Sequence, residues 1–234
     1  MTRPLTLFSL PAGLVLLACA GGPGKPGDTA AAGSDQDVRG IYALTWSDTL
    51  TVRLDIGGAV QEVTAQADEV VTFNAPDGTP LELDLAAYCA DPAVTCPSEA
   101  WPTRVAIDQD DPTVVSDLHT LRAWDADAMG AVVSGAVDHR NDTFLFALDG
   151  ASGGSENCAA LSLSLAGGTF AYPAPADTAD TAAEGAPTGL GPTGIDDGAV
   201  AVGWLGVCAW DGLAVAATLS VETTYTGVRT GPLE

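Results

Sequence analysis

Apolar and polar residues alternate along much of the chain from residue 40 onward. Between Leu213 and Tyr225 nearly every second residue is apolar or aromatic, and the residues between them are small or polar. A period of two is typical of a β-strand that has one face in a core and the other in water. The same pattern appears in the shorter segments 49–56, 81–85 and 161–165. Further strands are expected at 41–46, 59–65, 69–75, 103–108, 113–122, 130–138, 143–148 and 199–210.

Turn residues fall between these segments, and no segment shows the i, i+3, i+4, i+7 apolar stripe of a helix. Roughly ten to twelve strands joined by hairpins predict an all-β, antiparallel domain. We expect an up-and-down barrel, with a two-sheet β-sandwich as the alternative. The Gly40-Ile41-Tyr42 opening and the meander of hairpins resemble a lipocalin-type barrel. The pairs that supply the positive φ of hairpin turns are Gly57-Gly58, Asp77-Gly78, Asp149-Gly150, Gly167-Gly168 and Asp211-Gly212.

The first 18 residues have a different pattern. One positive charge, Arg3, precedes an apolar run that ends at Ala18. About 14 apolar residues are too few to span a membrane as a helix but suit a signal peptide. The run ends in Leu16-Leu17-Ala18-Cys19, which resembles the lipobox of bacterial lipoproteins. The resemblance implies cleavage after Ala18 and attachment of diacylglycerol to the Cys19 thiol; an ordinary secretory signal is the alternative.

The resemblance also implies a location and a division of the chain. In two-membrane bacteria a residue other than Asp after the lipidated cysteine, here Ala20, favours the outer membrane. Residues 19–38 are rich in Gly, Ala, Pro, Asp and Ser and are expected to form a flexible tether. Residues 39–234 then form one all-β domain. Residues 173–194 carry no β-branched apolar residue and are expected to be a disordered insert in it.

The chain is strongly acidic, and its charge excludes several functions. Its 234 residues include 31 Asp and Glu against 8 Lys and Arg, a formal net charge of −23. Such a surface repels phosphates, which excludes nucleic-acid binding through a basic patch. Polybasic binding to anionic lipid is excluded for the same reason. Aromatic residues make up 6% of the chain, too few for the two aromatic girdles of an integral outer-membrane barrel.

Four cysteines remain once Cys19 is assigned to lipid. An even number in an exported protein predicts disulfides. We favour Cys89–Cys96, which closes a short loop, together with Cys158–Cys208, which brackets the insert. Crossed pairings and a metal site are the alternatives, although the chain has no C-x-x-C spacing and only two histidines.

Two patterns could carry catalysis. Gly150-Ala151-Ser152-Gly153-Gly154 matches the G-x-S-x-G of a hydrolase nucleophile elbow. However, no helix is expected after it and both histidines precede it, so we interpret it as a hairpin loop. His119 and His139 lie in flanking β segments, with Asp138 and Asp142 near the second. They would form an acid–base or metal pair only if the rings lay within about 4–8 Å beside acidic groups. We predict no catalytic residue and no metal ligand.

Aspartates cluster at Asp108, Asp110 and Asp111 and again at Asp125 and Asp127. Positions 129 and 136, which an EF-hand would fill with ligands, hold Met and Ala. We therefore expect solvated turn carboxylates, with a surface Ca²⁺ site in a loop as the alternative. No other cofactor is expected.

The sequence predicts a lipid-anchored protein of the bacterial cell envelope with a non-catalytic β-domain. A structural or interaction module needs a filled interior and an exposed apolar patch or a free strand edge. A module that binds a small molecule or carbohydrate needs a cavity of a few hundred Å³. The residues expected to face inward are mainly Ala, Val, Leu and Gly, which favours the structural or interaction module. A hydrolase or metal-dependent enzyme is less favoured. Trp204 and Trp210 lie in dense apolar runs and are expected in the core rather than against a sugar.

Overall fold

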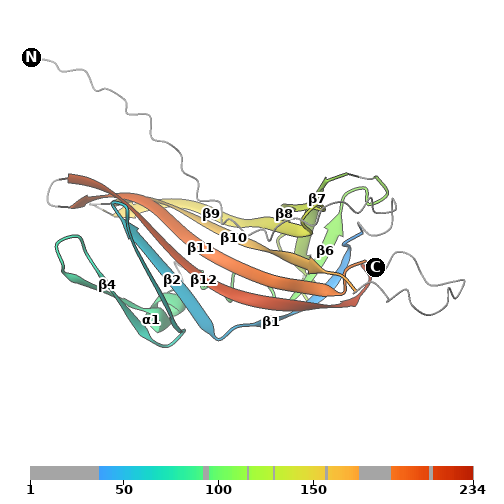
Figure 1. The fold of residues 1–234 in the computed structure, drawn as a ribbon, viewed down its shortest axis with the longest axis horizontal. Coiled ribbons are helices and arrows are strands. Elements are labelled where there is room, and N and C mark those ends of the chain that lie inside the picture. The colour runs from blue at the N-terminus through green and yellow to red at the C-terminus, as the bar shows by residue number, and fades with distance from the viewer. Residues whose placement is uncertain are drawn as a thin grey trace, which may run out of the picture. The chain divides into compact units, whose positions relative to one another are not determined.

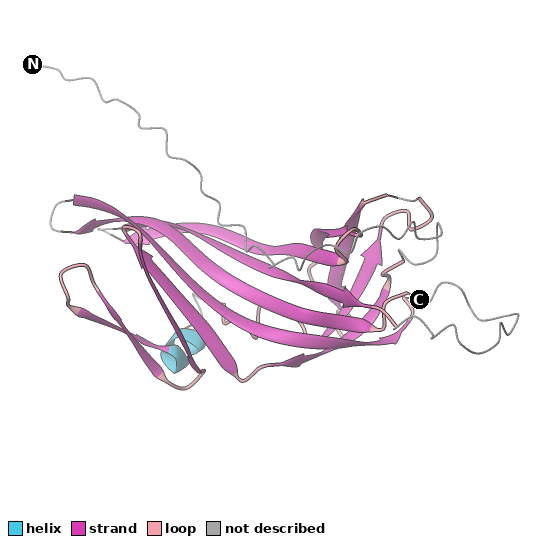
Figure 2. Cartoon of the chain, in the orientation of Figure 1, coloured by secondary structure: helices cyan, strands magenta, loops and turns pink. Residues whose placement is uncertain are grey.

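The computed structural model describes residues 37–233 apart from 92–94, 115, 129, 156–157, 174–190 and 211–212. The expected signal peptide, Cys19 and most of the tether lie outside the described residues. Within them, no helix is long and apolar enough to cross a membrane. Figures 1 and 2 show the twelve strands and the helix of this part of the chain. They are β1 (Gly40–Trp46), β2 (Thr49–Ile56), β3 (Ala59–Gln66), β4 (Val70–Asn74), β5 (Pro80–Asp84), α1 (Leu85–Ala90), β6 (Arg104–Gln109), β7 (Leu118–Asp125), β8 (Val133–Asp138), β9 (Thr143–Ser155), β10 (Cys158–Ala171), β11 (Gly194–Trp210) and β12 (Leu213–Gly231).

Eight strands close into an antiparallel barrel. Strands β6 to β12 are neighbours in chain order, and β1 pairs with both β6 and β12. The prediction of an all-β antiparallel barrel is therefore confirmed. The β-sandwich alternative is wrong, because the β1–β12 pairing closes the sheet on itself. The barrel is also not a simple meander, since β2 to β5 stand between β1 and β6 in the sequence but lie outside the barrel.

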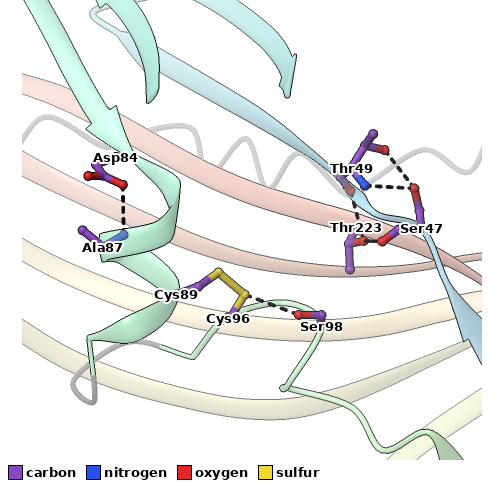
Figure 3. The surroundings of a disulfide bond; sticks show 8 residues. All are labelled: Ser47, Thr49, Asp84, Ala87, Cys89, Cys96, Ser98 and Thr223. Atoms are coloured by element: carbon purple, nitrogen blue, oxygen red, sulfur yellow. Dashed lines mark hydrogen bonds between the residues drawn. A yellow bond between two sulfur atoms is a disulfide. The ribbon is translucent and has the colours of Figure 1, made fainter. Parts of the chain in front are cut away.

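Strand β12 is long enough to pair with two strands, β1 and β2, along the same edge. Residues 225–231 pair with β1, and residues 217–222 pair with β2. Between them, the buried hydroxyl of Thr223 donates to the carbonyl oxygen of Thr49 at 3.2 Å or to that of Ser47 at 3.4 Å (Figure 3). The hydroxyl thus supplies a hydrogen bond to a backbone carbonyl at the point where the partner of β12 changes from β1 to β2. Strands β2 and β3 continue the sheet beyond the barrel (Figure 1).

Two hydrophobic clusters hold this arrangement. One fills the barrel, and the other packs the β4–β5 hairpin and α1 against β2, β3 and β12. Asp84 is the last residue of β5 and the N-cap of α1, because its carboxylate accepts a hydrogen bond from the Ala87 N–H at 3.0 Å. The expected strand 81–85 therefore ends at Asp84, and the fully buried Leu85 is the first residue of a helix that the alternation did not predict.

Several expected turns lie inside strands. Asp149-Gly150 and the Gly/Ser segment after it belong to β9, which runs to Ser155, so the hairpin loop expected there is wrong. Gly167-Gly168 lies in β10, where the register shifts against β11. The expected turn glycines Gly57 and Gly78 do adopt positive φ, 61° and 84°. Turn-type glycines thus form turns in the hairpins outside the barrel and an irregularity within a long strand of the barrel.

The domain boundaries also differ slightly from the expectation. Val38, assigned to the tether, is fully buried in the barrel cluster. Residues 174–190 of the expected insert lie outside the described residues. The last residue of that insert, Gly194, is the first residue of β11.

Candidate functional site

Aromatic side chains fill the interior of the barrel. Tyr42, Phe144, Phe146, Phe170 and Tyr225 are each at most 4% exposed. The ring centroids of Phe144 lie 4.7 Å from Phe170 and 5.7 Å from Phe146. Tyr42 lies 5.9 Å from Phe170. These contacts pack the aromatic rings against one another inside the barrel, where the sequence predicted small aliphatic side chains with few aromatics.

The outward face of β10 carries its leucines. Leu161 and Leu163 are 54% and 42% exposed, whereas Ser164 and Ala166 are 6% and 0% exposed. The alternation predicted this strand, but the leucines do not enter the core. The register with β11 sets the faces, because it places Ala166 opposite the fully buried Val200.

Strand β11 extends this apolar surface. Leu205, 58% exposed, lies directly opposite Leu161, and Val207, 50% exposed, lies opposite Ala159. We call Leu161, Leu163, Leu205 and Val207 the outer apolar patch. It lies on the outward face of the sheet, away from both hydrophobic clusters.

The strands that carry the outer apolar patch have no charged residues around it. No Asp, Glu, Lys or Arg occurs in residues 158–171, 198–210 or 213–221, although the whole chain has a net charge of −23. On this face, Glu222 of β12 lies opposite Ala201. One strand further on, Arg53 and Asp55 of β2 lie opposite Ser220 and Thr218. Burial raises the pKa of Glu222, and the nearby carboxylate of Glu62 raises it further. Uncharged, exposed apolar surface on an acidic protein is typical of a contact site.

The structure brings His119 and His139 together. Their ring centroids are 5.0 Å apart and the rings are nearly perpendicular, at 76°. The sheet register explains this, because His119 of β7 pairs with Val137 of β8. His139 follows Val137 by two residues, a spacing that places both side chains on one face of the sheet. His139 also donates its backbone N–H to the Asp117 carbonyl at 2.9 Å. The distance required for an acid–base or metal pair is therefore met.

The reactive atoms of this pair are buried. His119 is 7% exposed, and its Nε2 lies 2.9 Å from the Val114 carbonyl oxygen. Neither Nδ1 of His119 nor Nε2 of His139 has a hydrogen-bond partner among the described residues. Both nitrogens are thus enclosed by the side chains around them, although His139 as a whole is partly exposed.

Carboxylates surround the second histidine. Burial lowers the pKa of His139, and the neighbouring His119 lowers it further, while Asp138 and Asp117 oppose this effect. Arg140 lies 3.3 Å from Asp138 and 3.8 Å from Asp117. Burial and the charge of Asp138 raise the pKa of Asp142, which has a positive φ of 55°. Within the described ranges, no group of three or more His, Cys, Asp or Glu side chains is placed to hold a metal ion.

A cleft of about 320 Å³ lies where residues 95–102 meet the last residues of β7 and the first residues of β8. Trp101 and Trp124 line it, together with the carboxyl-bearing residues Glu99 and Asp125. Trp101 is 3% exposed and packs 5.2 Å from Phe146, and its indole N–H has no acceptor in the described part of the chain. The cleft has the size of a small-molecule site, and Trp101 and Ala123 of its lining also belong to the cluster that fills the barrel.

One of the two expected disulfides is present. Cys89 in α1 is bonded to Cys96, seven residues on, and ties the helix to the loop that follows it (Figure 3). Cys158 and Cys208 are direct register partners in the β10–β11 pair, although their side chains lie outside the described residues. Antiparallel partners have Cα atoms about 4.5–5.5 Å apart, which is within the range of disulfides. The Cys158–Cys208 bond stays a prediction.

The remaining candidates of the sequence are scattered. Ser152 lies in β9 opposite Leu161 of β10, so the strand–turn–helix geometry of a nucleophile elbow is absent from this described segment. Asp108 pairs with Arg122 at 2.8 Å, and Asp127 pairs with Arg104. Trp204 packs against the second cluster, with its ring 5.6 Å from Tyr88 and edge-on to it. The side chain of Trp210 lies outside the described residues.

The fold defines this protein as a closed eight-stranded antiparallel β-barrel with two β-hairpins, β2–β3 and β4–β5, and a helix outside it. Comparison with models of protein families, with curated proteins and with solved structures finds no match.

Proposed function

We propose that this chain is a lipid-anchored protein of the bacterial cell envelope whose barrel is a non-catalytic interaction module. The outer apolar patch is the surface that binds the partner, an envelope protein with an uncharged apolar contact surface. The observation that carries the proposal is the orientation of β10, which exposes Leu161 and Leu163 and buries Ser164. Exposed leucines beside a buried serine leave burial energy unused unless another molecule covers them.

The size of the patch indicates a partner held nearby. Its four side chains are each about half exposed, so covering them contributes roughly 3–6 kcal/mol. Loss of translational and rotational freedom costs an association roughly 4–15 kcal/mol. Two proteins confined to one membrane lose less of this freedom on binding, because confinement raises their effective concentration. A small apolar patch therefore suits a membrane-held protein better than a freely diffusing one.

The anchor supports the same proposal. The Leu16-Leu17-Ala18-Cys19 segment resembles a lipobox. Asp37, the first described residue, comes only 18 positions after Cys19, and such a segment spans at most about 60 Å. A barrel tethered in this way would stay close to envelope proteins in the same membrane.

The deciding experiment places a photo-crosslinking amino acid at Leu205 in intact cells, with Thr120 on β7 as the exposed control position. We expect Leu205 to form one discrete adduct with an envelope protein. The adduct should disappear when Leu161→Asp is added, because a carboxylate opposite Leu205 disrupts an apolar contact. An unchanged melting temperature would show that this exposed substitution leaves the fold intact. Equal adduct patterns from both positions, or no adduct from Leu205, would contradict the proposal.

The anchor is tested separately. Mass spectrometry of the native N-terminal peptide should find Cys19 as the first residue, carrying acyl chains. Cys19→Ala should move the protein from the membrane fraction to the soluble fraction, because one residue carries the lipid. An unmodified thiol at Cys19, or retention of the signal peptide, would contradict the lipid anchor but would leave the proposed role of the outer apolar patch unaffected.

The 320 Å³ cleft favours a second candidate function, binding of a small molecule or carbohydrate. Trp101 supplies an unpartnered N–H, and the lining includes both apolar and carboxylate groups, which suit a ligand with a flat face and hydroxyl groups. Tryptophan fluorescence titration with a panel of simple sugars tests it. The signal change should be lost in Trp124→Ala and kept in Leu205→Asp.

A further inference from the structure

The geometry points to His119 and His139 as a two-imidazole site for one divalent transition-metal ion of the Zn²⁺ or Cu²⁺ class. This inference concerns the end of the barrel where β7 and β8 meet, and it does not depend on the outer apolar patch or on the lipid anchor. It is carried by the two buried nitrogens without partners, by the hydrogen bond that orients His119, and by the ring separation.

The hydrogen bond of His119 fixes which nitrogen is free. A carbonyl oxygen only accepts, so Nε2 must carry the proton that it donates to Val114 at 2.9 Å. In a neutral imidazole the other nitrogen, Nδ1, then holds a bare lone pair. Metal-binding histidines typically donate their second N–H to a carbonyl or carboxylate in this way. The Nδ1 lone pair of His119 is buried without a partner, which costs roughly 1–3 kcal/mol if it stays empty.

The ring separation suits a shared ion. Two imidazoles that bind one ion at metal–nitrogen distances of about 2.0–2.1 Å, with a tetrahedral angle between them, have ring centres roughly 5 Å apart. The observed separation of the His119 and His139 rings is 5.0 Å. Nε2 of His139 is the second buried nitrogen without a partner, and it comes from the strand end beside β7. Imidazole nitrogens favour Zn²⁺ and Cu²⁺ over Ca²⁺ or Mg²⁺.

The surrounding charges favour a cation at this point. Asp117 and Asp138 both act electrostatically on His139, and the chain as a whole is strongly acidic. Because the described residues place no third protein ligand there, water completes the coordination. The nitrogens are enclosed, so the ion is expected to enter most readily as the strands close during folding.

Electron paramagnetic resonance with Cu²⁺ alone tests the site on the full chain. The protein is stripped with a chelator, and one equivalent of Cu²⁺ is added both to the folded protein and before refolding from denaturant. We expect one ion per chain and hyperfine splitting from two nitrogens. His139→Gln should weaken binding at least about tenfold and leave one nitrogen. The matched control is Glu62→Gln on β3, which removes an exposed carboxylate and should change neither affinity nor spectrum.

The outcomes are distinct. Two nitrogens in the unmodified chain support the site even if His139→Gln fails to fold, because that spectrum needs no variant. A spectrum with oxygen ligands only, binding unchanged in a folded His139→Gln variant, or no binding by either route of addition overturns the inference. Loss of binding in Glu62→Gln alone would assign the ion to surface carboxylates and would also overturn it.

Discussion

Gly198 on β11 is a position where one added methyl group should destabilise the barrel. It is the register partner of Tyr225, whose ring covers it. A Cβ on Gly198 would lie 2.4 Å from Cε2 and 2.5 Å from Cδ2 of that ring. The ring has little freedom to move, because Tyr225 is 3% exposed and lies 5.1 Å from Trp46. Its hydroxyl also donates to the Gly167 carbonyl oxygen at 3.0 Å.

The cost of Gly198→Ala follows from these contacts. Inserting a methylene into a packed core typically costs about 1–3 kcal/mol. Displacing the ring would also break the buried hydrogen bond from Tyr225, which contributes roughly 1 kcal/mol. We therefore expect the free energy of unfolding to fall by roughly 2–4 kcal/mol, which for a domain of this size lowers the melting temperature by about 4–16 °C. Tyr225→Phe, which removes only the hydrogen bond, should cost about 1 kcal/mol.

The matched control is Gly203→Ala on the same strand. A Cβ there would have its nearest neighbour at 3.7 Å, an ordinary contact. Since alanine is favoured over glycine within a strand by roughly 0.5–1 kcal/mol, this variant should be neutral or slightly more stable. Urea denaturation with a constant m-value measures both. Equal losses in the two variants, or a Gly198→Ala variant as stable as the unmodified protein, would refute the proposed packing of Tyr225 over Gly198.

Three further predictions concern the cysteines and one carboxylate. Replacing Cys89 and Cys96 by Ser should lower the free energy of unfolding by about 2.5 kcal/mol, from the entropy of an eight-residue loop; an unchanged urea midpoint would contradict this. Non-reducing peptide mapping should recover Cys158 joined to Cys208, whereas a crossed pair would contradict the register argument. Because the pKa of Glu222 is raised in the fold, charging it opposes folding, so stability falls as pH rises through the window between its unfolded and folded pKa. Glu222→Gln should raise the melting temperature at neutral pH, with no gain below about pH 4, where the unfolded carboxyl is also protonated.

Local patterns in the sequence predicted the strands well. The alternation in 49–56 and 213–225 gives both the strand and its buried face, because Val52 and Val221 are fully buried. Turn chemistry was less informative, since glycine pairs occur both where the chain reverses and where a long strand bulges. The helix α1 was not predicted because six residues are too few to show a helical period.

Long-range pairing could not be predicted from local patterns. The His119–His139 contact depends on β7 and β8 being neighbours in a particular register, and a shift of one residue would turn one ring to the other face. The outward leucines of β10 have the same origin. Both faces of β10 carry small or apolar residues, so the neighbouring strands β9 and β11 decide which face enters the barrel.

The acidity of the chain and its outer apolar patch are best understood together. A net charge of −23 keeps copies of the protein apart by repulsion over roughly a Debye length, about 8 Å at physiological salt. An apolar face of four half-exposed side chains would otherwise promote association between copies. Repulsion between like chains would leave this face free for the partner that we propose, which lacks the negative charge. Added salt should therefore promote self-association of the unmodified chain, and Leu205→Asp should suppress it.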